Sequence, residues 1–341
     1  VLLFRDHAVI WGRAGGLHFL EIHDLKRGGS HRISYDEPYY TLALDHDANP
    51  VFDTNVVRFS YQSYITPPSD FDYDMDARRT TLVKRREVPG YDPSQYRSER
   101  IFATTADGTR VPITLVSRAD TPRDGTAPLL LQGYGAYAVV FANVFDPAHL
   151  SLLDRGLIVA TAHVRGGGEY GQAWHQAGKL LRKRNTFTDF LACADHLVAN
   201  RYTRRDRLAI SGQSAGGLLI AASLNLRPDL CRAALLDVPF VDVLNTQSDP
   251  DLPLTTQEYP EWGNPAIREQ YEVMRSYSPY ENIAATSYPA MLVRAALHDS
   301  QVPYWEPVKY VARMRATRKD QNLQILKIAM DSGHQGASGR Y

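Results

Sequence analysis

The segment Ala209-Ile-Ser-Gly-Gln-Ser-Ala-Gly-Gly-Leu-Leu-Ile220 joins an apolar run to a helical pattern of small and apolar residues. The run predicts a strand that ends at Ser211, and the pattern predicts a helix that begins at Ala215. The sequence Gly-Gln-Ser-Ala-Gly between them fits a sharp strand-to-helix turn that exposes the hydroxyl of Ser214. Glycine suits both flanks, because a strained turn and close helix-strand packing exclude a Cβ atom. Alone, the five residues also fit an anion-binding turn at a helix N-terminus.

The regions around this segment alternate buried strands with helices from about residue 100 onward. Such alternation is typical of an α/β domain whose mostly parallel, doubly wound sheet is covered on both faces. The predicted strands are residues 128–132, 157–162, 207–211, 233–236, 290–294 and 323–328. The predicted helices are residues 186–200, 215–226 and 303–317. In the first helix we expect Thr186 to be the cap and Asp189 to lie in the first turn.

Residues 1–84 have a different pattern, with short strands separated by turns. The predicted strands are residues 17–22, 56–61, 72–75 and 80–83, in an antiparallel style. The segment 86–96, which contains Pro89-Gly90 and Asp92-Pro93, is expected to be a linker. The sequence therefore predicts two domains, an antiparallel β region at 1–84 and an α/β region at 85–341.

The composition of the 341 residues is that of a globular protein, with 44% hydrophobic and 22% charged residues. The 38 basic residues equal the 38 acidic ones, so no overall charge attracts nucleic acid or an anionic membrane. No apolar run approaches the roughly 20 residues that span a bilayer. Cys193 and Cys231 are too few for a disulfide framework, which suits a cytoplasmic location. The eleven histidines lack ligand spacing, and we expect no metal site.

Two further residues complete a possible catalytic set with Ser214. Asp299, within Leu297-His-Asp-Ser-Gln-Val302, follows the predicted strand 290–294, and His334, within Asp331-Ser-Gly-His-Gln-Gly336, follows the strand 323–328. The order Ser, Asp, His is the one that α/β-hydrolases use. Because the carboxyl ends of parallel strands meet at one edge, three distant loops can converge there. His334 would accept the serine proton and Asp299 would orient the imidazole.

Several longer stretches resemble the prolyl oligopeptidase family of serine peptidases, and in particular its oligopeptidase B branch. Besides those already quoted, they are Glu87-Val-Pro-Gly-Tyr-Asp-Pro-Ser-Gln-Tyr96, Gln132-Gly-Tyr-Gly-Ala-Tyr137, His163-Val-Arg-Gly-Gly-Gly-Glu169, Gly178-Lys-Leu-Leu181, Asn185-Thr-Phe-Thr-Asp-Phe190, Glu261-Trp-Gly-Asn-Pro265 and Gly336-Ala-Ser-Gly-Arg-Tyr341. The resemblance implies an α/β-hydrolase domain at 85–341, preceded by strands from the end of a seven-bladed β-propeller at 1–84. The chain therefore looks like a C-terminal fragment.

The resemblance also implies roles for individual residues. Tyr134 would donate its hydroxyl to an oxyanion alongside the backbone N–H of Ala215, since fixed donors stabilise developing negative charge. Glu258 falls on the glutamate of the family's first specificity pocket, S1, and its carboxylate can accept a guanidinium group. The implied activity is that of a serine endopeptidase that cleaves short peptides after Arg or Lys through an acyl-enzyme, without metal or cofactor.

A few positions depart from the patterns of the family. Pro260 stands where the branch often has a second acid, and Ala142 and Val144 stand where several relatives carry acids that favour a basic P2 residue. Val273 occupies the position of a substrate-stacking Trp in the proline-specific branch, which argues against proline at P1. We therefore expect Arg or Lys at P1, the residue whose carbonyl is attacked, while these departures leave the P2 preference open.

Other interpretations share parts of this evidence. The stretch His163 to Glu169 lacks the Lys-Ser/Thr of a phosphate-binding loop, so we expect a structural loop in which Arg165 and Glu169 form ion pairs. The fold also supports an esterase or acyl transferase, or an inactive hydrolase-like binding module. The propeller-like strands and Glu258 favour the peptidase, and the complete Ser-Asp-His set argues against an inactive module. The sequence leaves the oligomeric state open.

Overall fold

The computed structural model describes residues 1–141 and 144–336. These residues form two compact units. The first comprises residues 1–100, 114–120 and 144–156, and the second comprises 101–113, 121–141 and 157–336.

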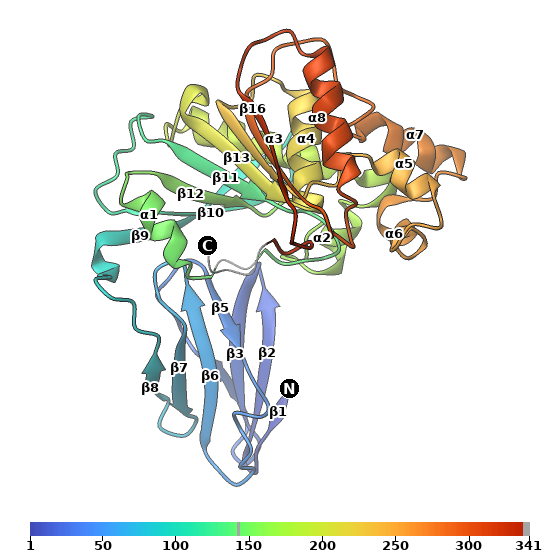
Figure 1. Ribbon diagram of the computed structural model, residues 1–341. Helices are drawn as coiled ribbons and strands as arrows, with labels where there is room; N and C mark the ends of the chain where they lie inside the picture. The colour runs from blue at the N-terminus through green and yellow to red at the C-terminus, as the bar shows by residue number, and fades with distance from the viewer. Residues whose placement is uncertain (142–143, 337–341) are drawn as a thin grey trace. The chain divides into compact units, whose positions relative to one another are not determined.

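The first unit contains two four-stranded antiparallel sheets (Figure 1). The strands of one sheet are β1 (Leu2–Leu3), β2 (His7–Ala14), β3 (Leu17–Asp24) and β4 (Ser30–Arg32). Those of the other are β5 (Tyr40–Ala43), β6 (Val56–Ser63), β7 (Ser69–Asp74) and β8 (Arg79–Arg85). In each sheet the strands follow one another in chain order. The antiparallel β structure predicted for this region is confirmed.

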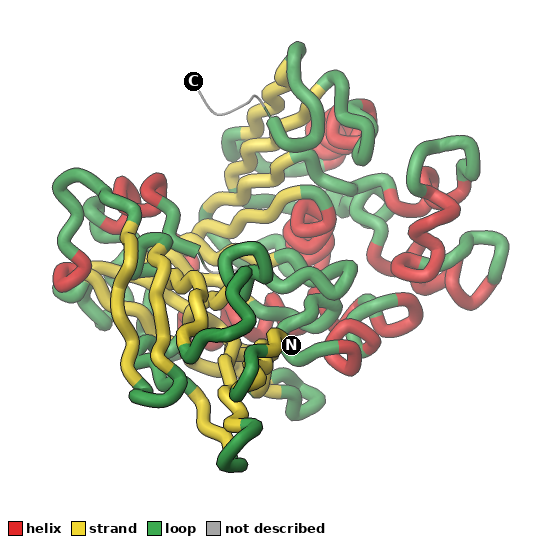
Figure 2. Tube along the Cα trace, turned by 90° about the horizontal axis from the view of Figure 1, so that it is seen from below, coloured by secondary structure: helices red, strands yellow, loops and turns green. Residues whose placement is uncertain are grey.

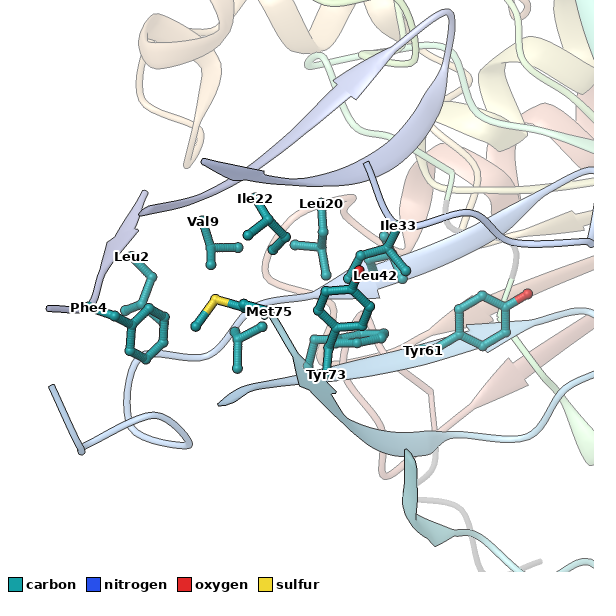
Figure 3. Close-up of a cluster of buried hydrophobic side chains, with 12 residues drawn as sticks. Leu2, Phe4, Val9, Leu20, Ile22, Ile33, Leu42, Tyr61, Tyr73 and Met75 are labelled. Carbon is teal, nitrogen blue, oxygen red and sulfur yellow. The ribbon is translucent and has the colours of Figure 1, made fainter. Parts of the chain in front are cut away.

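Side chains from both sheets build one hydrophobic core (Figure 3). In β6, Val57, Phe59 and Tyr61 are buried and alternate with more exposed residues, as expected for a strand with one face on a core. Figure 3 shows Leu20 and Ile22 of β3 on the side of the cluster opposite Tyr73 of β7. Contact between the two sheets therefore buries the apolar face of each.

The large sheet has eight strands in the order β16-β15-β14-β13-β11-β12-β10-β9. The bounds are β9 (Tyr96–Thr104), β10 (Arg110–Arg118), β11 (Leu129–Gly133), β12 (Ile158–Ala162), β13 (Leu208–Gln213), β14 (Ala233–Asp237), β15 (Ala290–Ala296) and β16 (Gln324–Ala329). The six strands from β11 to β16 pair in parallel. All six correspond to predicted strands, and the predicted α/β-hydrolase sheet is confirmed.

The described chain also contains eight α-helices. They are α1 (Pro147–Leu153), α2 (Gln172–Gln176), α3 (Arg184–Ala199), α4 (Ala215–Leu226), α5 (Val243–Ser248), α6 (Thr255–Trp262), α7 (Arg268–Tyr277) and α8 (Trp305–Thr317). Helix α4 packs on β13 and β14, α8 packs on β15 and β16, and α3 packs on α4. Figure 1 shows these three helices along one side of the parallel strands, and Figure 2 shows helices beside the ladder of strands. Across the described residues, no helix has the length and apolarity needed to cross a membrane.

The strand order creates a crevice beside β11. The chain passes from β11 to β12 on one side of it, and then returns to β13 on its other side. In open α/β sheets, ligands bind outside the carboxyl ends of strands where the order reverses in this way. Tyr134 follows β11 and Ser214 follows β13, so both stand at this point of the sheet.

The start of α3 differs from the prediction. The helix begins at Arg184, and Thr186 does not cap it. The hydroxyl of Thr186 donates instead to the backbone oxygens of Arg165 (2.8 Å) and Gly178 (3.1 Å). Asp189 is fully buried and binds Arg165. The predicted cap and the predicted first-turn position of Asp189 were both wrong, because the helix begins two residues earlier and both side chains bind groups outside it, at Arg165 and Gly178.

A buried carboxyl group joins α8 to the segment that follows β14. Glu306, in the first turn of α8, is fully buried. Its Oε2 accepts hydrogen bonds from the backbone N–H groups of Val241 (3.1 Å) and Asp242 (2.9 Å), and its Oε1 accepts one from the Thr246 hydroxyl (2.6 Å). Burial raises the pKa of Glu306 to about 7.

This raised pKa predicts a pH-dependent stability. The folded state binds the Glu306 proton more tightly than the unfolded state, so the stabilising contribution is complete below about pH 4.5 and is lost as pH rises to about 7. Glutamine at position 306 does not titrate, so the stability of Glu306→Gln lacks this pH dependence. The difference between its free energy of unfolding and that of the original protein should therefore increase by about 3 kcal/mol as the pH rises over this range. Urea unfolding between pH 4.5 and 7.5 measures the change. The exposed Glu269→Gln is the control, and parallel curves for the original protein and Glu306→Gln would contradict the prediction.

Candidate active site

Ser214 stands in a left-handed backbone conformation between β13 and α4. Its φ is +58° and its ψ is −120°. The backbone N–H of Ser214 donates to Asp237 O (2.9 Å), and its carbonyl accepts from the N–H groups of Leu218 and Phe240 (both 3.2 Å). A non-glycine residue in such a conformation costs about 1–3 kcal/mol, and persists where its surroundings hold it. Here both backbone groups of the serine are held.

The glycines of this turn have no room for a side chain. A Cβ atom on Gly212 would lie 2.2 Å from Gly216 O, and one on Gly216 would lie 2.7 Å from Gly133 O. On Gly217 it would lie 2.4 Å from the Pro239 Cβ. Strand and helix therefore approach backbone to backbone, as the sequence led us to expect.

His334 and Asp299 form a pair on the loops after β16 and β15. His334 Nδ1 lies 2.8 Å from Asp299 Oδ2 and 3.0 Å from Oδ1. Asp299 Oδ1 also accepts from the backbone N–H groups of Gln301 (2.8 Å) and Val302 (2.9 Å). The aspartate side chain is only 1% exposed, so its carboxylate is fixed behind the imidazole. Because Nδ1 faces the carboxylate, Nε2 is the ring nitrogen left for proton transfer.

One cavity of about 490 Å³ brings these loops together. Ser214, His334 and Tyr134 line it, together with residues of the parallel strands such as Leu130 and Leu235. Burial raises the pKa of Tyr134, and the neighbouring Ser214 side chain acts in the opposite direction. The phenol is therefore neutral at neutral pH. Ala215 is buried and begins α4 directly after Ser214.

Glu258 lies in the first turn of α6. Its Oε1 accepts a hydrogen bond from the Tyr137 hydroxyl (2.7 Å), and its Oε2 accepts one from Trp262 Nε1 (3.2 Å). Trp262 Nε1 also donates to the Tyr137 hydroxyl (3.0 Å). Burial raises the pKa of Glu258, and these two hydrogen bonds oppose the rise. The carboxylate is thus held by neutral donors.

Glu258 does not line the cavity that contains Ser214. It lines a second cavity of about 410 Å³, whose other lining residues are Tyr137, His175, Lys179, Leu254, Gln257, Pro260 and Glu261. The charge of Glu258 nevertheless raises the pKa of Tyr134, so the two sites are electrostatically close. The sequence did not predict the helix that carries this glutamate.

The other positions at which the sequence departs from the family patterns lie in several different elements. Pro260 is inside α6 and lines the same cavity as Glu258. Val273 is in α7, and Val144 precedes α1. Ala142 lies outside the described residues, as do positions 337–341 of the last quoted stretch.

The 163–169 loop is held by buried ion pairs. Arg165 Nη2 lies 2.6 Å from Asp189 Oδ1, and Nη1 lies 2.7 Å from Asp107 Oδ2. His163 Nδ1 lies 3.3 Å from Glu169 Oε1. A Cβ atom on Gly166 would lie 2.1 Å from the backbone oxygen of Gly135. The predicted ion pairing is confirmed for Arg165, whereas the side-chain partner of Glu169 is the ring of His163. The glycines allow this loop to touch the segment after β11.

Sequence reasoning missed several residues around Tyr134 and Glu258. Tyr137, Trp262 and Glu261 occur in the quoted stretches, which served only to show the resemblance. Lys183 is buried, although it stands in the run Leu-Arg-Lys-Arg that reads as solvent-exposed. Among residues 1–141 and 144–336, no group of three or more His, Cys, Asp or Glu side chains is arranged to hold a metal ion.

The strand order and this site define a class of protein. A serine in a left-handed turn after a central parallel strand, with Asp and His on later loops at the same sheet edge, is the arrangement of an α/β-hydrolase. Residues 143–341 match the prolyl oligopeptidase family, and residues 1–86 match the N-terminal β-propeller domain of prolyl oligopeptidase. The chain belongs to the prolyl oligopeptidase family.

Relatives with established names share much of the sequence. The chain is 44% identical to dipeptidyl aminopeptidase BI of Pseudoxanthomonas mexicana over 340 residues, which cover 99% of this chain and 47% of the relative. It is 43% identical to protease 2 of Moraxella lacunata, over 99% of this chain and 49% of the relative. The chain therefore spans about half the length of these curated relatives.

Solved structures give the same picture. Oligopeptidase B from Leishmania major is 41% identical and superimposes with a TM-score of 0.90 over 97% of this chain and 47% of its own. Oligopeptidase B from Trypanosoma brucei, in a closed form with covalently bound antipain, is 41% identical with a TM-score of 0.91. That match covers 99% of this chain and 49% of the other.

The packing of the turn predicts that Gly212→Ala is destabilising. The added methyl group would meet backbone atoms of Gly216, which cannot rotate away, so strand and helix must separate. We expect a loss of about 1–3 kcal/mol in the free energy of unfolding. Urea unfolding measures it, with the adjacent Ser211→Ala as the control. Equal stability of the two variants would show that the contact is not tight.

Proposed function

We propose that the protein is a serine oligopeptidase that hydrolyses short peptides after Arg or Lys through an acyl-enzyme intermediate. The observation that carries the proposal is the half-buried carboxylate of Glu258, which accepts a hydrogen bond from the Tyr137 hydroxyl at 2.7 Å and whose charge acts on Tyr134 in the cavity of Ser214 and His334. Neutral donors hold this carboxylate in place and leave its charge unpaired for a cationic ligand. Similarity to oligopeptidase B from two organisms supports the same activity.

The first chemical step is attack by Ser214 Oγ on the peptide carbonyl. A serine hydroxyl is a weak nucleophile at neutral pH and needs a base to take its proton. His334 Nε2 takes this role, while Asp299 holds Nδ1 and stabilises the imidazolium that forms. The imidazolium then protonates the leaving amine. Water then attacks the carbonyl of the acyl-enzyme, with His334 again as the base, and this step releases the acid product and restores Ser214.

Negative charge develops on the carbonyl oxygen during both attacks. The Tyr134 hydroxyl and the backbone N–H of Ala215 are the proposed donors to this oxyanion. The raised pKa of Tyr134 keeps the phenol protonated at neutral pH, so it remains a donor. Removal of one such donor typically slows a reaction by roughly 10²- to 10³-fold.

Glu258 is the proposed source of specificity. A guanidinium group can bond both oxygens of a carboxylate, and the rings of Tyr137 and Trp262 lie beside it for contact with a cation. Pro260 supplies no second charge, so a single carboxylate selects the P1 residue. Val144 also brings no acid for P2, and we therefore expect a broad P2 range. The cytoplasmic location expected from the two cysteines stays a prediction.

The name of one relative suggests a second activity. Dipeptidyl aminopeptidase BI, 44% identical to this chain, is named for the removal of dipeptides from a free N-terminus. The S1 carboxylate proposed here is compatible with this activity, since it binds the side chain and not the peptide amine. The substrate's N-terminus therefore distinguishes the two.

A cleavage profile of the full-length protein tests the proposed function. A peptide library, with free and acetylated N-termini, should be cut after Arg and Lys at internal bonds in both forms. Cleavage only of peptides with a free N-terminus, after the second residue, would favour the aminopeptidase. Hydrolysis of esters with no cleavage of peptides would overturn the proposal. Ser214→Ala is the control and should lose both cleavage and labelling by a fluorophosphonate, because it lacks the attacking oxygen.

Replacement of Glu258 tests the specificity separately. Glu258→Gln keeps the shape of the side chain and removes its charge, which strands the cationic substrate group. We expect kcat/KM for arginyl substrates to fall by roughly 2–5 kcal/mol in transition-state stabilisation. Substrates with Phe at P1 are the matched control and should change little. An unchanged Arg-over-Phe preference would remove Glu258 from the specificity site.

A further inference from the structure

Lys183, Glu261 and His175 form a buried cluster that the proposed mechanism does not use. The Lys183 side chain is 2% exposed, and its Nζ donates to Gly135 O at 2.7 Å and lies 3.9 Å from Glu261 Oε1. The other oxygen of Glu261, Oε2, lies 2.6 Å from His175 Nε2. These residues come from α6, from α2 and from the position before α3. They meet inside the second unit.

The cluster holds one short segment at two points. We call residues 134–137, which begin with Tyr134, the 134–137 turn. Lys183 binds the carbonyl of Gly135, and Glu261 Oε1 accepts from the backbone N–H of Tyr137 at 3.1 Å. Lys183 and Glu261 are in turn joined to each other. The lysine and the glutamate therefore bracket the turn.

The 134–137 turn needs such support because of its backbone. Gly135 has a φ of +76° and Tyr137 has a φ of +57°. A left-handed tyrosine costs about 1–3 kcal/mol, and it is retained only where contacts determine it. At Gly135 a Cβ atom would lie 2.4 Å from the Thr186 Cγ2, so the turn is also pressed against the start of α3.

The turn carries two side chains that matter to the proposed reaction. At one end, Tyr134 lines the same cavity as Ser214. At the other end, the Tyr137 hydroxyl donates to Glu258. A change in the backbone between them would move both.

Burial of an ammonium group costs free energy, because the charge loses its hydration. Burial lowers the pKa of Lys183 to about 8, against the opposing charge of Glu261. The ring of Trp262, whose centroid is 4.6 Å from the lysine nitrogen, covers the same charge. A methionine of similar length would pack there without this desolvation cost. The cation does, however, join a carbonyl and a carboxylate, which an apolar side chain cannot do.

We propose that Lys183 and Glu261 are positioning residues, which fix the 134–137 turn so that the Tyr134 hydroxyl meets the oxyanion beside Ser214. This inference rests on the proposed function. It assigns the lysine to the rate of acylation and not to recognition of the P1 side chain. A small displacement of a catalytic group can cost roughly 10²-fold in rate.

The test is Lys183→Met in the full-length protein, with the exposed neighbour Arg184→Met as its matched control. Active serines are titrated with a fluorophosphonate, and hydrolysis of an arginyl amide is expressed per titrated serine. We expect Lys183→Met to lower kcat by roughly 10- to 100-fold, with KM within about threefold, and Arg184→Met to change neither. A purely structural lysine would reduce the number of titrated serines and leave the rate per serine unchanged. That result would overturn the inference.

A second variant covers the case in which Lys183→Met does not fold. Glu261→Gln keeps an oxygen that can accept from the Tyr137 N–H, but it loses the charge that pairs with Lys183. It should also lower kcat per titrated serine, and a rate equal to that of the original protein would contradict the proposal. Where both variants fold, the kcat of the double variant should be little lower than that of the less active single variant, because both substitutions act on one turn. Independent, multiplicative losses would argue against a shared turn.

The failure of this inference is distinguishable from failure of the proposed function. If the original protein cleaves arginyl amides and Lys183→Met matches it per serine, only the positioning role is wrong. If the original protein neither cleaves them nor reacts with the fluorophosphonate, the proposed function is wrong.

Discussion

The close approach of β13 and α4 is the constraint on which the site depends. Gly212 and Gly216 let strand and helix touch through their backbones, and Ser214 in the turn between them has a positive φ. This conformation places the serine at the carboxyl edge of the sheet, beside the strand where the order reverses. Loops from β11, β15 and β16 then need only short extensions to reach it. The backbone conformation of Ser214 and the order of the strands therefore together determine where the serine lies.

The two acids of α6 show how surroundings give similar side chains different tasks. Glu261 lies against the Lys183 ammonium and the His175 ring, so its charge is used inside the protein. Glu258, one turn earlier, is held by the hydroxyl of Tyr137 and the indole N–H of Trp262, neither of which is charged. Neutral donors keep the carboxylate in place without cancelling its charge. Of the two acids, Glu258 is the one whose charge is left unpaired by the side chains that hold it.

The sequence predicted the parallel strands and the helices α4 and α8 well, because their apolar patterns are local. It also brought Ser214, Asp299 and His334 together, since chain order in a parallel sheet determines which loops share an edge. It did not predict α5 and α6, which have only six and eight residues, and it missed α7 although the apolar residues of that helix recur with helical spacing. Contacts such as Tyr137 with Glu258 join positions 121 residues apart, which no local pattern records. Lys183 stands among exposed basic residues, and only the fold shows that it is buried.

The positive φ of Ser214 has an evolutionary consequence. A glycine at this position would adopt the same backbone without the cost of a Cβ atom, which is about 1–3 kcal/mol for a strained residue. Mutation without selection on the hydroxyl would therefore tend to replace the serine with glycine and make the fold more stable. Stability alone cannot maintain a serine at this position. In a duplicated copy of the gene, a glycine here would be an early sign that the hydroxyl is no longer under selection.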